Sequence, residues 1–118
     1  MNFVRVCTAS EVAPSTCREF SVGRRRVLIC EHLGQYYAHS TICPHQGNSL
    51  DGARLWGRMI ECPWHHYEFD VATGENGYPS RVDPGELLGE LRHTVRPLRT
   101  FPLERRGHDL YVAFPSDQ

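Results

Sequence analysis

Cys43-Pro44-His45 and Cys62-Pro63-Trp64-His65 are the two stretches that decide the interpretation of this chain. Each stretch offers one thiol and one imidazole, as Cys-x-His in the first and Cys-x-x-His in the second. Positions 46 to 61 separate them, which is enough for a strand and its return to fold the two stretches against each other. The adjacent prolines restrict the backbone beside each cysteine. The spacing therefore predicts a metal centre held by two loops, with four ligands: Cys43, His45, Cys62 and His65.

Two metal centres use a set of two cysteines and two histidines. One is a 2Fe–2S cluster in which two histidines replace two cysteines on one iron. The other is a structural zinc site, which usually pairs cysteine with cysteine and histidine with histidine along the chain. Here each loop is mixed, so each can send its cysteine to one iron and its histidine to the other. We therefore expect an iron–sulfur cluster and keep zinc as the alternative, with unrelated core cysteines and histidines as a third interpretation.

The residues around the ligands resemble those of Rieske ferredoxins, and the resemblance covers nearly the whole chain. It implies one Rieske-type 2Fe–2S cluster, with Cys43 and Cys62 on the inner iron and His45 and His65 on the outer iron, near the protein surface. The matching positions are Cys43-Pro44-His45-Gln46-Gly47, Leu50, Gly52, Ile60-Glu61-Cys62-Pro63-Trp64-His65, Phe69-Asp70 and Thr73-Gly74.

Other residues near the loops have less specific interpretations. The Cys-x-x-His spacing favours His65 over His66, which we interpret as an exposed neighbour or a partner contact. Gly77-Tyr78-Pro79 falls where Rieske domains carry a third, proline-containing loop over the cluster, although a plain turn is an alternative. Glu61 and Glu68 flank the second loop and are candidates for steering a partner. Four histidines are expected on the surface or in turns: His32, His39, His93 and His108.

The reduction potential is expected at the low end of the Rieske range. Histidine ligands leave the oxidised cluster formally neutral, which raises its potential into a band of about −150 to +300 mV. High-potential members add a disulfide between the loops and hydroxyl groups aimed at the cluster. Here Trp64 stands where the extra cysteine would be, His66 and Tyr67 replace a Gly-Ser pair, and Phe69 replaces a tyrosine. Fewer hydrogen bonds to sulfur stabilise the reduced state less, which suits delivery to an oxygenase and argues against a quinol-oxidising complex.

Short strands separated by turns are expected over the rest of the chain. Leu110, Val112 and Phe114 alternate with Tyr111 and Ala113, as in a half-buried strand. The expected strands cover residues 3–7, 19–22, 27–31, 36–39, 57–61, 67–71, 101–104 and 110–114.

These strands predict an all-β fold, and the resemblance implies the same: a Rieske-type β-sandwich or barrel. We expect a single domain over residues 1–118, with a cluster-binding subdomain at about 41–79 formed by the two ligand loops. One helical turn or two is expected within 81–96, where Asp83-Pro84-Gly85-Glu86 offers a helix N-terminus.

Composition says little about partners. Thirteen basic residues against fourteen acidic ones leave a net charge of −1, which gives no argument for nucleic acid or membrane binding. No apolar run approaches the roughly 18 residues of a membrane span, and the first residues lack the pattern of a signal peptide. The remaining cysteines, Cys7, Cys17 and Cys30, are expected to be reduced thiols in a cytoplasmic protein.

The function expected is one-electron transfer rather than catalysis. The chain would pass electrons from a flavin-containing NAD(P)H-dependent reductase to a terminal oxygenase or a similar acceptor. It has too few residues after Cys62 to build the mononuclear iron site of an oxygenase subunit. Two alternatives remain: the small subunit of a nitrite-reductase-like complex, and a zinc-bound structural or interaction module.

Overall fold

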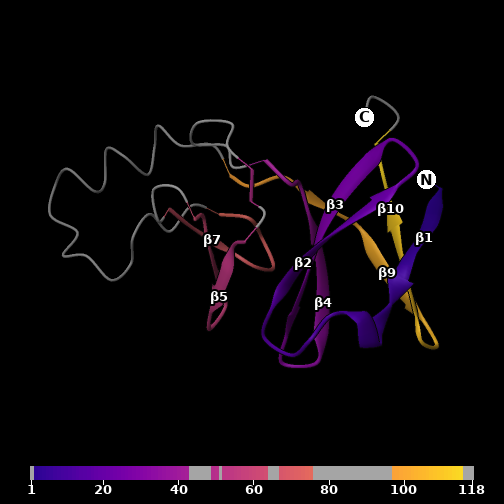
Figure 1. The fold of residues 1–118 in the computed structure, drawn as a ribbon, viewed down its shortest axis with the longest axis horizontal. Helices are drawn as coiled ribbons and strands as arrows, with labels where there is room; N and C mark the ends of the chain where they lie inside the picture. The colour runs from indigo at the N-terminus through magenta and orange to yellow at the C-terminus, as the bar shows by residue number, and fades with distance from the viewer. Residues whose placement is uncertain (1, 43–48, 51, 64–66, 76–96, 116–118) are drawn as a thin grey trace, which may run out of the picture.

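The computed structural model describes residues 2–42, 49–50, 52–63, 67–75 and 97–115. Within these residues it is almost entirely β-structure, in three antiparallel sheets (Figure 1). The first sheet has the strand order β1-β10-β9, the second β2-β3-β4-β8 and the third β5-β6-β7. The elements are β1 (Phe3–Thr8), η1 (Ala9–Glu11, a 3-10 turn), β2 (Cys17–Val22), β3 (Arg25–His32), β4 (Gln35–His39), β5 (Arg54–Trp56), β6 (Met59–Glu61), β7 (Glu68–Asp70), β8 (Thr100–Phe101), β9 (Leu103–Arg106) and β10 (Asp109–Ala113).

The second sheet is the middle layer of the molecule. Along β3, Val27 and Ile29 pack into a core shared with the first sheet, whereas Leu28 and Cys30 pack into a core shared with the third. All four side chains are at most 2% exposed. Burial on both faces explains why this strand is a continuous apolar run instead of an alternating one. Figure 1 shows the three layers side by side, with β5 and β7 at one end and β1, β9 and β10 at the other.

The predicted all-β fold is confirmed, with differences at the strand ends. The expected strand at 101–104 is two strands, β8 and β9, because Pro102 between them has no N–H to continue the ladder. The third sheet also contains β5, which the sequence did not predict, because three residues are too few to show a period. The helical turns expected within 81–96 lie outside the described residues.

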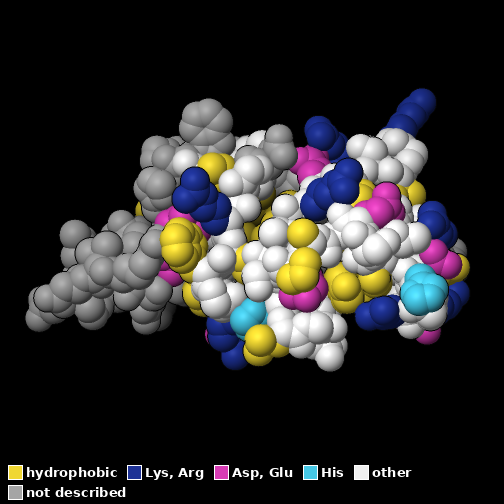
Figure 2. Space-filling view, turned by 60° about the horizontal axis from the view of Figure 1, so that its bottom comes forward, with side chains coloured by type: hydrophobic (Ala, Val, Ile, Leu, Met, Phe, Trp, Pro, Cys, Tyr) yellow, Lys and Arg dark blue, Asp and Glu magenta, His cyan; other side chains and the backbone are white. Residues whose placement is uncertain are grey.

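The described surface carries charges of both signs. On the face drawn in Figure 2, arginine side chains and acidic side chains lie among one another instead of forming one large patch. Some are paired, as Arg5 is with Asp109 at 3.0 Å and Arg106 with Glu104 at 3.0 Å. The described segments contain no helix with the length and hydropathy needed to span a bilayer.

Candidate metal centre

The first ligand loop leaves from a closed stem. Ile42 and Ser49 form an isolated antiparallel bridge, and the Leu50 N–H donates to the Thr41 carbonyl at 2.7 Å. The chain then turns, since the Ala53 N–H donates to the Leu50 carbonyl at 2.9 Å. Two of the four predicted ligands, Cys43 and His45, therefore lie in the sequence between these two paired positions.

The second ligand loop has a stem of the same kind. Strands β6 and β7 form a hairpin in which Glu61 lies opposite Glu68. The pairing extends one residue further, because the Cys62 N–H donates to the Tyr67 carbonyl at 2.8 Å. Among the described residues, Cys62 and Tyr67 are the last pair joined by a backbone bond before the segment that carries His65. This position gives the thiol a backbone that the sheet keeps in place.

The two stems meet in one apolar core. Leu50 from the first stem and Cys62 and Tyr67 from the second all belong to the core that contains Leu28 and Cys30 of β3. Cys62 is only 1% exposed, so a metal bound to its sulfur would lie against the protein interior. A set of two cysteines and two histidines, of which Cys62 is buried in this core, fits the ligands of a 2Fe–2S cluster.

The structure describes one of the four predicted ligands. Cys62 lies at the stem of its loop, as expected, and its sulfur is free of any disulfide. The other three, Cys43, His45 and His65, lie outside the described residues, as do His66 and the loop at Gly77-Tyr78-Pro79. Their assignment rests on their positions in the sequence between described stems.

The two glutamates beside the second loop are not surface residues. Glu61 is 7% exposed and Glu68 is 1% exposed, and the two lie opposite each other on β6 and β7. The Trp56 indole Nε1–H donates to Glu61 Oε1 at 2.9 Å. A buried carboxylate is screened from an approaching partner, so the predicted steering role for this pair is wrong. Their positions beside the loop gave no sign in the sequence that both side chains would be buried in the hairpin.

Asp70 organises the turn that leaves the second hairpin. Its carboxylate accepts bonds from Arg58 Nε at 2.7 Å, from the Ala72 N–H at 2.8 Å and from the Thr73 N–H at 3.0 Å. Partial burial acts to raise the pKa of Asp70, but the hydrogen bonds from Arg58 and the two backbone groups outweigh it, so the pKa lies below its usual value. The turn brings Gly74 to the segment just before β8, where the Leu98 N–H donates to the Gly74 carbonyl at 2.7 Å.

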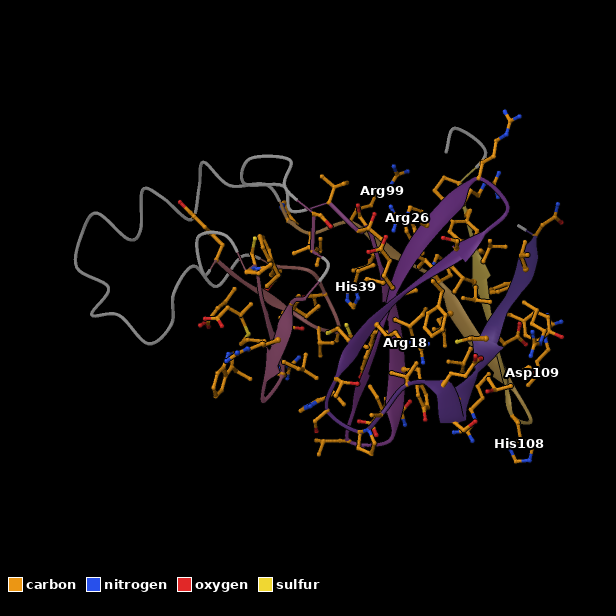
Figure 3. All side chains as sticks on the ribbon, in the orientation of Figure 1. Arg18, Arg26, His39, Arg99, His108 and Asp109 are labelled. Atoms are coloured by element: carbon orange, nitrogen blue, oxygen red, sulfur yellow. The ribbon has the colours of Figure 1, made fainter. Side chains whose placement is uncertain are left out.

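His39 joins the second sheet to the segment after β7. It is fully buried on β4, and its Nε2 lies 2.6 Å from the Val71 carbonyl oxygen, to which it donates. Figure 3 shows the ring between the middle sheet and the third sheet, whereas His108 lies at the opposite end of the molecule. The prediction that His39 is a surface or turn residue is therefore wrong. A lone histidine in a strand carries no sequence signal for such a bond, since Val71 is distant along the chain.

His39 should make the stability of the protein depend on pH. Burial lowers its pKa to about 4, against the opposing effect of the bond to Val71. A base whose folded pKa is depressed contributes its full stability above its unfolded pKa of about 6.5 and loses it as the pH falls toward the folded value. We expect this residue to remove about 2 kcal/mol from the free energy of unfolding between about pH 7.5 and about pH 5.

Denaturant unfolding across that pH range checks the expectation. The variant His39→Gln keeps a donor for Val71 but cannot titrate, so its unfolding free energy should change less with pH than that of the parent. His108→Gln is the matched control, since His108 is exposed and its removal should leave the pH dependence as it was. Equal pH dependence in the parent and His39→Gln would contradict the assignment.

Comparison with known proteins places these features in a family. The family model described as the Rieske [2Fe-2S] domain matches residues 2–101. Ferredoxin CarAc of Metapseudomonas resinovorans is 37% identical, over 94% of this chain and 92% of that protein. The ferredoxin component of the alkene monooxygenase system of Xanthobacter autotrophicus (strain ATCC BAA-1158 / Py2) is 31% identical, over 91% of this chain and 88% of that protein.

A solved structure shares the fold over nearly the same length. It is described as the complex of reduced oxygenase and oxidized ferredoxin in carbazole 1,9a-dioxygenase. The matching chain superposes with a TM-score of 0.72 at 30% identity, over 94% of this chain and 92% of that one. The similarity therefore extends across the first and second sheets and the third sheet, which carries the second ligand loop.

Proposed function

Because the chain belongs to the Rieske [2Fe-2S] domain family, we propose that it is the ferredoxin component of an oxygenase system and carries single electrons to a terminal oxygenase. Its relatives of similar length are named as ferredoxin components, which are electron carriers and not catalysts. The 2Fe–2S cluster of the family supplies the one-electron redox chemistry when it is bound. The protein would hold the four ligands, with Cys62 fixed by its place in the hairpin.

The ligands in this proposal are Cys43 and Cys62 for the inner iron and His45 and His65 for the outer iron. The observation that carries it is the position of Cys62, buried at the end of a paired hairpin and beside the stem of the first loop. A stem held by backbone hydrogen bonds keeps its ligand in the same place in both oxidation states. Small movement on electron transfer lowers the energy of reorganisation, which is what a carrier needs.

The proposed partners are a terminal oxygenase, which receives the electron, and a flavin-containing NAD(P)H-dependent reductase, which supplies it. Support for the first comes from the similar ferredoxin, whose structure is described as a complex with its oxygenase. The reductase is proposed because the ferredoxin accepts one electron at a time, whereas NAD(P)H gives up two. A flavin can take both electrons and pass them on singly. A cytoplasmic location is part of the proposal, supported by the free thiols of Cys7, Cys17 and Cys30.

Elemental analysis and electron paramagnetic resonance test the proposal directly. Protein purified without oxygen should contain two irons and two sulfides per chain, and after reduction with dithionite it should give a rhombic signal of low average g. A redox titration should place the midpoint in the lower part of the band from about −150 to +300 mV. A colourless protein that holds one zinc and gives no signal would contradict the proposal and favour a structural module.

A further inference from the structure

Cys17 and Cys30 lie directly opposite each other on β2 and β3. The backbone bonds beside them define the kind of pair. The Glu31 N–H donates to the Thr16 carbonyl at 3.0 Å, so the bonds flank the two cysteines and Cys17–Cys30 is a non-hydrogen-bonded pair. In such pairs the Cα atoms are about 4.5 Å apart and the side chains are close. A disulfide accepts Cα separations of about 4.4 to 6.8 Å.

Both thiols project from the same face of the second sheet. Cys30 packs in the core between the second and third sheets, and Cys17 packs against that same core. The structure has both cysteines as free thiols. The hydrogen bond between them is one of the causes, after burial, that hold the pKa of Cys30 well above its usual value. The two sulfurs are therefore neighbours, and closing a bond between them does not require β2 and β3 to separate.

Access to the pair is one-sided. Cys17 is half-buried and lines a cavity of about 290 Å³ together with Thr16, Leu55 and Trp56, between the second and third sheets. Cys30 is fully buried behind it. A small, uncharged oxidant can meet Cys17 in the cavity, whereas Cys30 is not among the residues that line it. This arrangement has an outer thiol that reacts first and an inner thiol that resolves the product.

We propose that Cys17 and Cys30 form a reversible disulfide when the protein meets a hydroperoxide. In the first step the Cys17 sulfur attacks the peroxide oxygen, the O–O bond breaks, and Cys17 becomes a sulfenic acid while the peroxide leaves as an alcohol or water. In the second step the Cys30 sulfur displaces water from that sulfenic acid, and the S–S bond forms. Two thiols lose two electrons in total, and the hydroperoxide takes them both.

The product can be reversed by thiol–disulfide exchange, in which a thiol reductant attacks one of the two sulfurs and both cysteines return to thiols. The pair therefore offers a modification that forms under peroxide and reverses with a thiol reductant.

The other described cysteines lack this arrangement. Cys7 lies opposite Leu110, so β10 offers it no thiol partner, and burial raises the pKa of Cys7 to about 11. It is therefore a matched control, because it is a buried cysteine on a strand that should stay a thiol. Cys62 is assigned to the metal centre and should be protected by its metal.

The experiment treats the metal-loaded full chain with hydrogen peroxide in small steps and counts thiols by alkylation after denaturation. We expect the parent to lose two alkylatable thiols together, with a Cys17–Cys30 crosslinked peptide in a non-reducing digest and full recovery after a thiol reductant. Cys7→Ala should lose the same two thiols. In Cys17→Ser, the remaining thiol of the pair, Cys30, should stay fully alkylatable at the same peroxide dose.

Three outcomes would overturn the inference. One is oxidation of Cys17 to sulfinic acid while Cys30 remains a thiol. Another is loss of Cys30 in the Cys17→Ser variant at the rate seen in the parent. The third is that the first thiols lost are the predicted metal ligands Cys43 and Cys62, with the visible absorption falling in step. The metal analysis described above is a separate measurement, so a zinc-loaded protein would contradict the electron-carrier proposal while leaving the thiol result to be judged on its own.

Discussion

Replacing Cys62 with alanine is expected to abolish the 2Fe–2S cluster while leaving the first and second sheets folded. The thiolate is the metal ligand in cysteine sites, so alanine at position 62 removes one of the four proposed ligands. Cys62 is held at the end of the β6–β7 hairpin by the bond from its N–H to the Tyr67 carbonyl, and this backbone bond does not depend on the sulfur. Iron and sulfide analysis of protein purified without oxygen should fall from two of each per chain to near none.

Two controls separate loss of a ligand from loss of packing. Cys7→Ala removes a sulfur of equal size and burial from the other core, and it should keep its iron. His66→Ala removes the imidazole next to the proposed ligand His65 and should also keep its iron. Full iron content in Cys62→Ala would overturn the ligand assignment, and loss of iron in His66→Ala would overturn the choice between the two adjacent histidines.

Gly74→Ala is expected to destabilise the protein by about 3 kcal/mol, since a left-handed backbone and a close contact act together. Gly74 has a φ of +77°, a conformation that favours glycine. A Cβ built at this position would overlap the backbone carbonyl oxygen of Leu98, which is not the end of a flexible side chain and cannot move aside. Leu98 is itself buried in the core between the second and third sheets. The thermal midpoint should fall by about 10 °C.

Gly107→Ala is the matched control for that substitution. Gly107 has a φ of +62°, similar to that of Gly74, but a Cβ there would meet no atom within 4 Å. It should cost about 1 kcal/mol, the conformational part alone. Equal losses of stability in the two variants would mean that the approach of Leu98 to Gly74 carries no energy.

Much of the fold and the chemistry could be predicted from short-range patterns. Alternation at Leu110, Val112 and Phe114 predicted β10, and the bulk of those side chains does lie in the core. The apolar run Val27 to Cys30 lies within the strand expected at 27–31, which the structure has as β3.

The residues that join the layers could not be predicted in this way. His39 bonds to Val71 across 32 positions of the chain, and Gly74 touches Leu98, so neither contact has a local signature. Glu61 and Glu68 looked like solvent-facing charges, and only the register of β6 against β7 turns them inward. In each case the deciding neighbour is distant in sequence.

The sequence by itself determined the class of metal centre and the type of fold, because ligand chemistry and strand periodicity are written within a few residues. Only the tertiary structure decided which thiols can meet. The register of β2 against β3 sets Cys17 opposite Cys30, and a shift of one residue would have turned one of them to the other face of the sheet. Side-chain neighbours across a sheet depend on pairing between distant segments, and that pairing is settled by the packing of the whole domain.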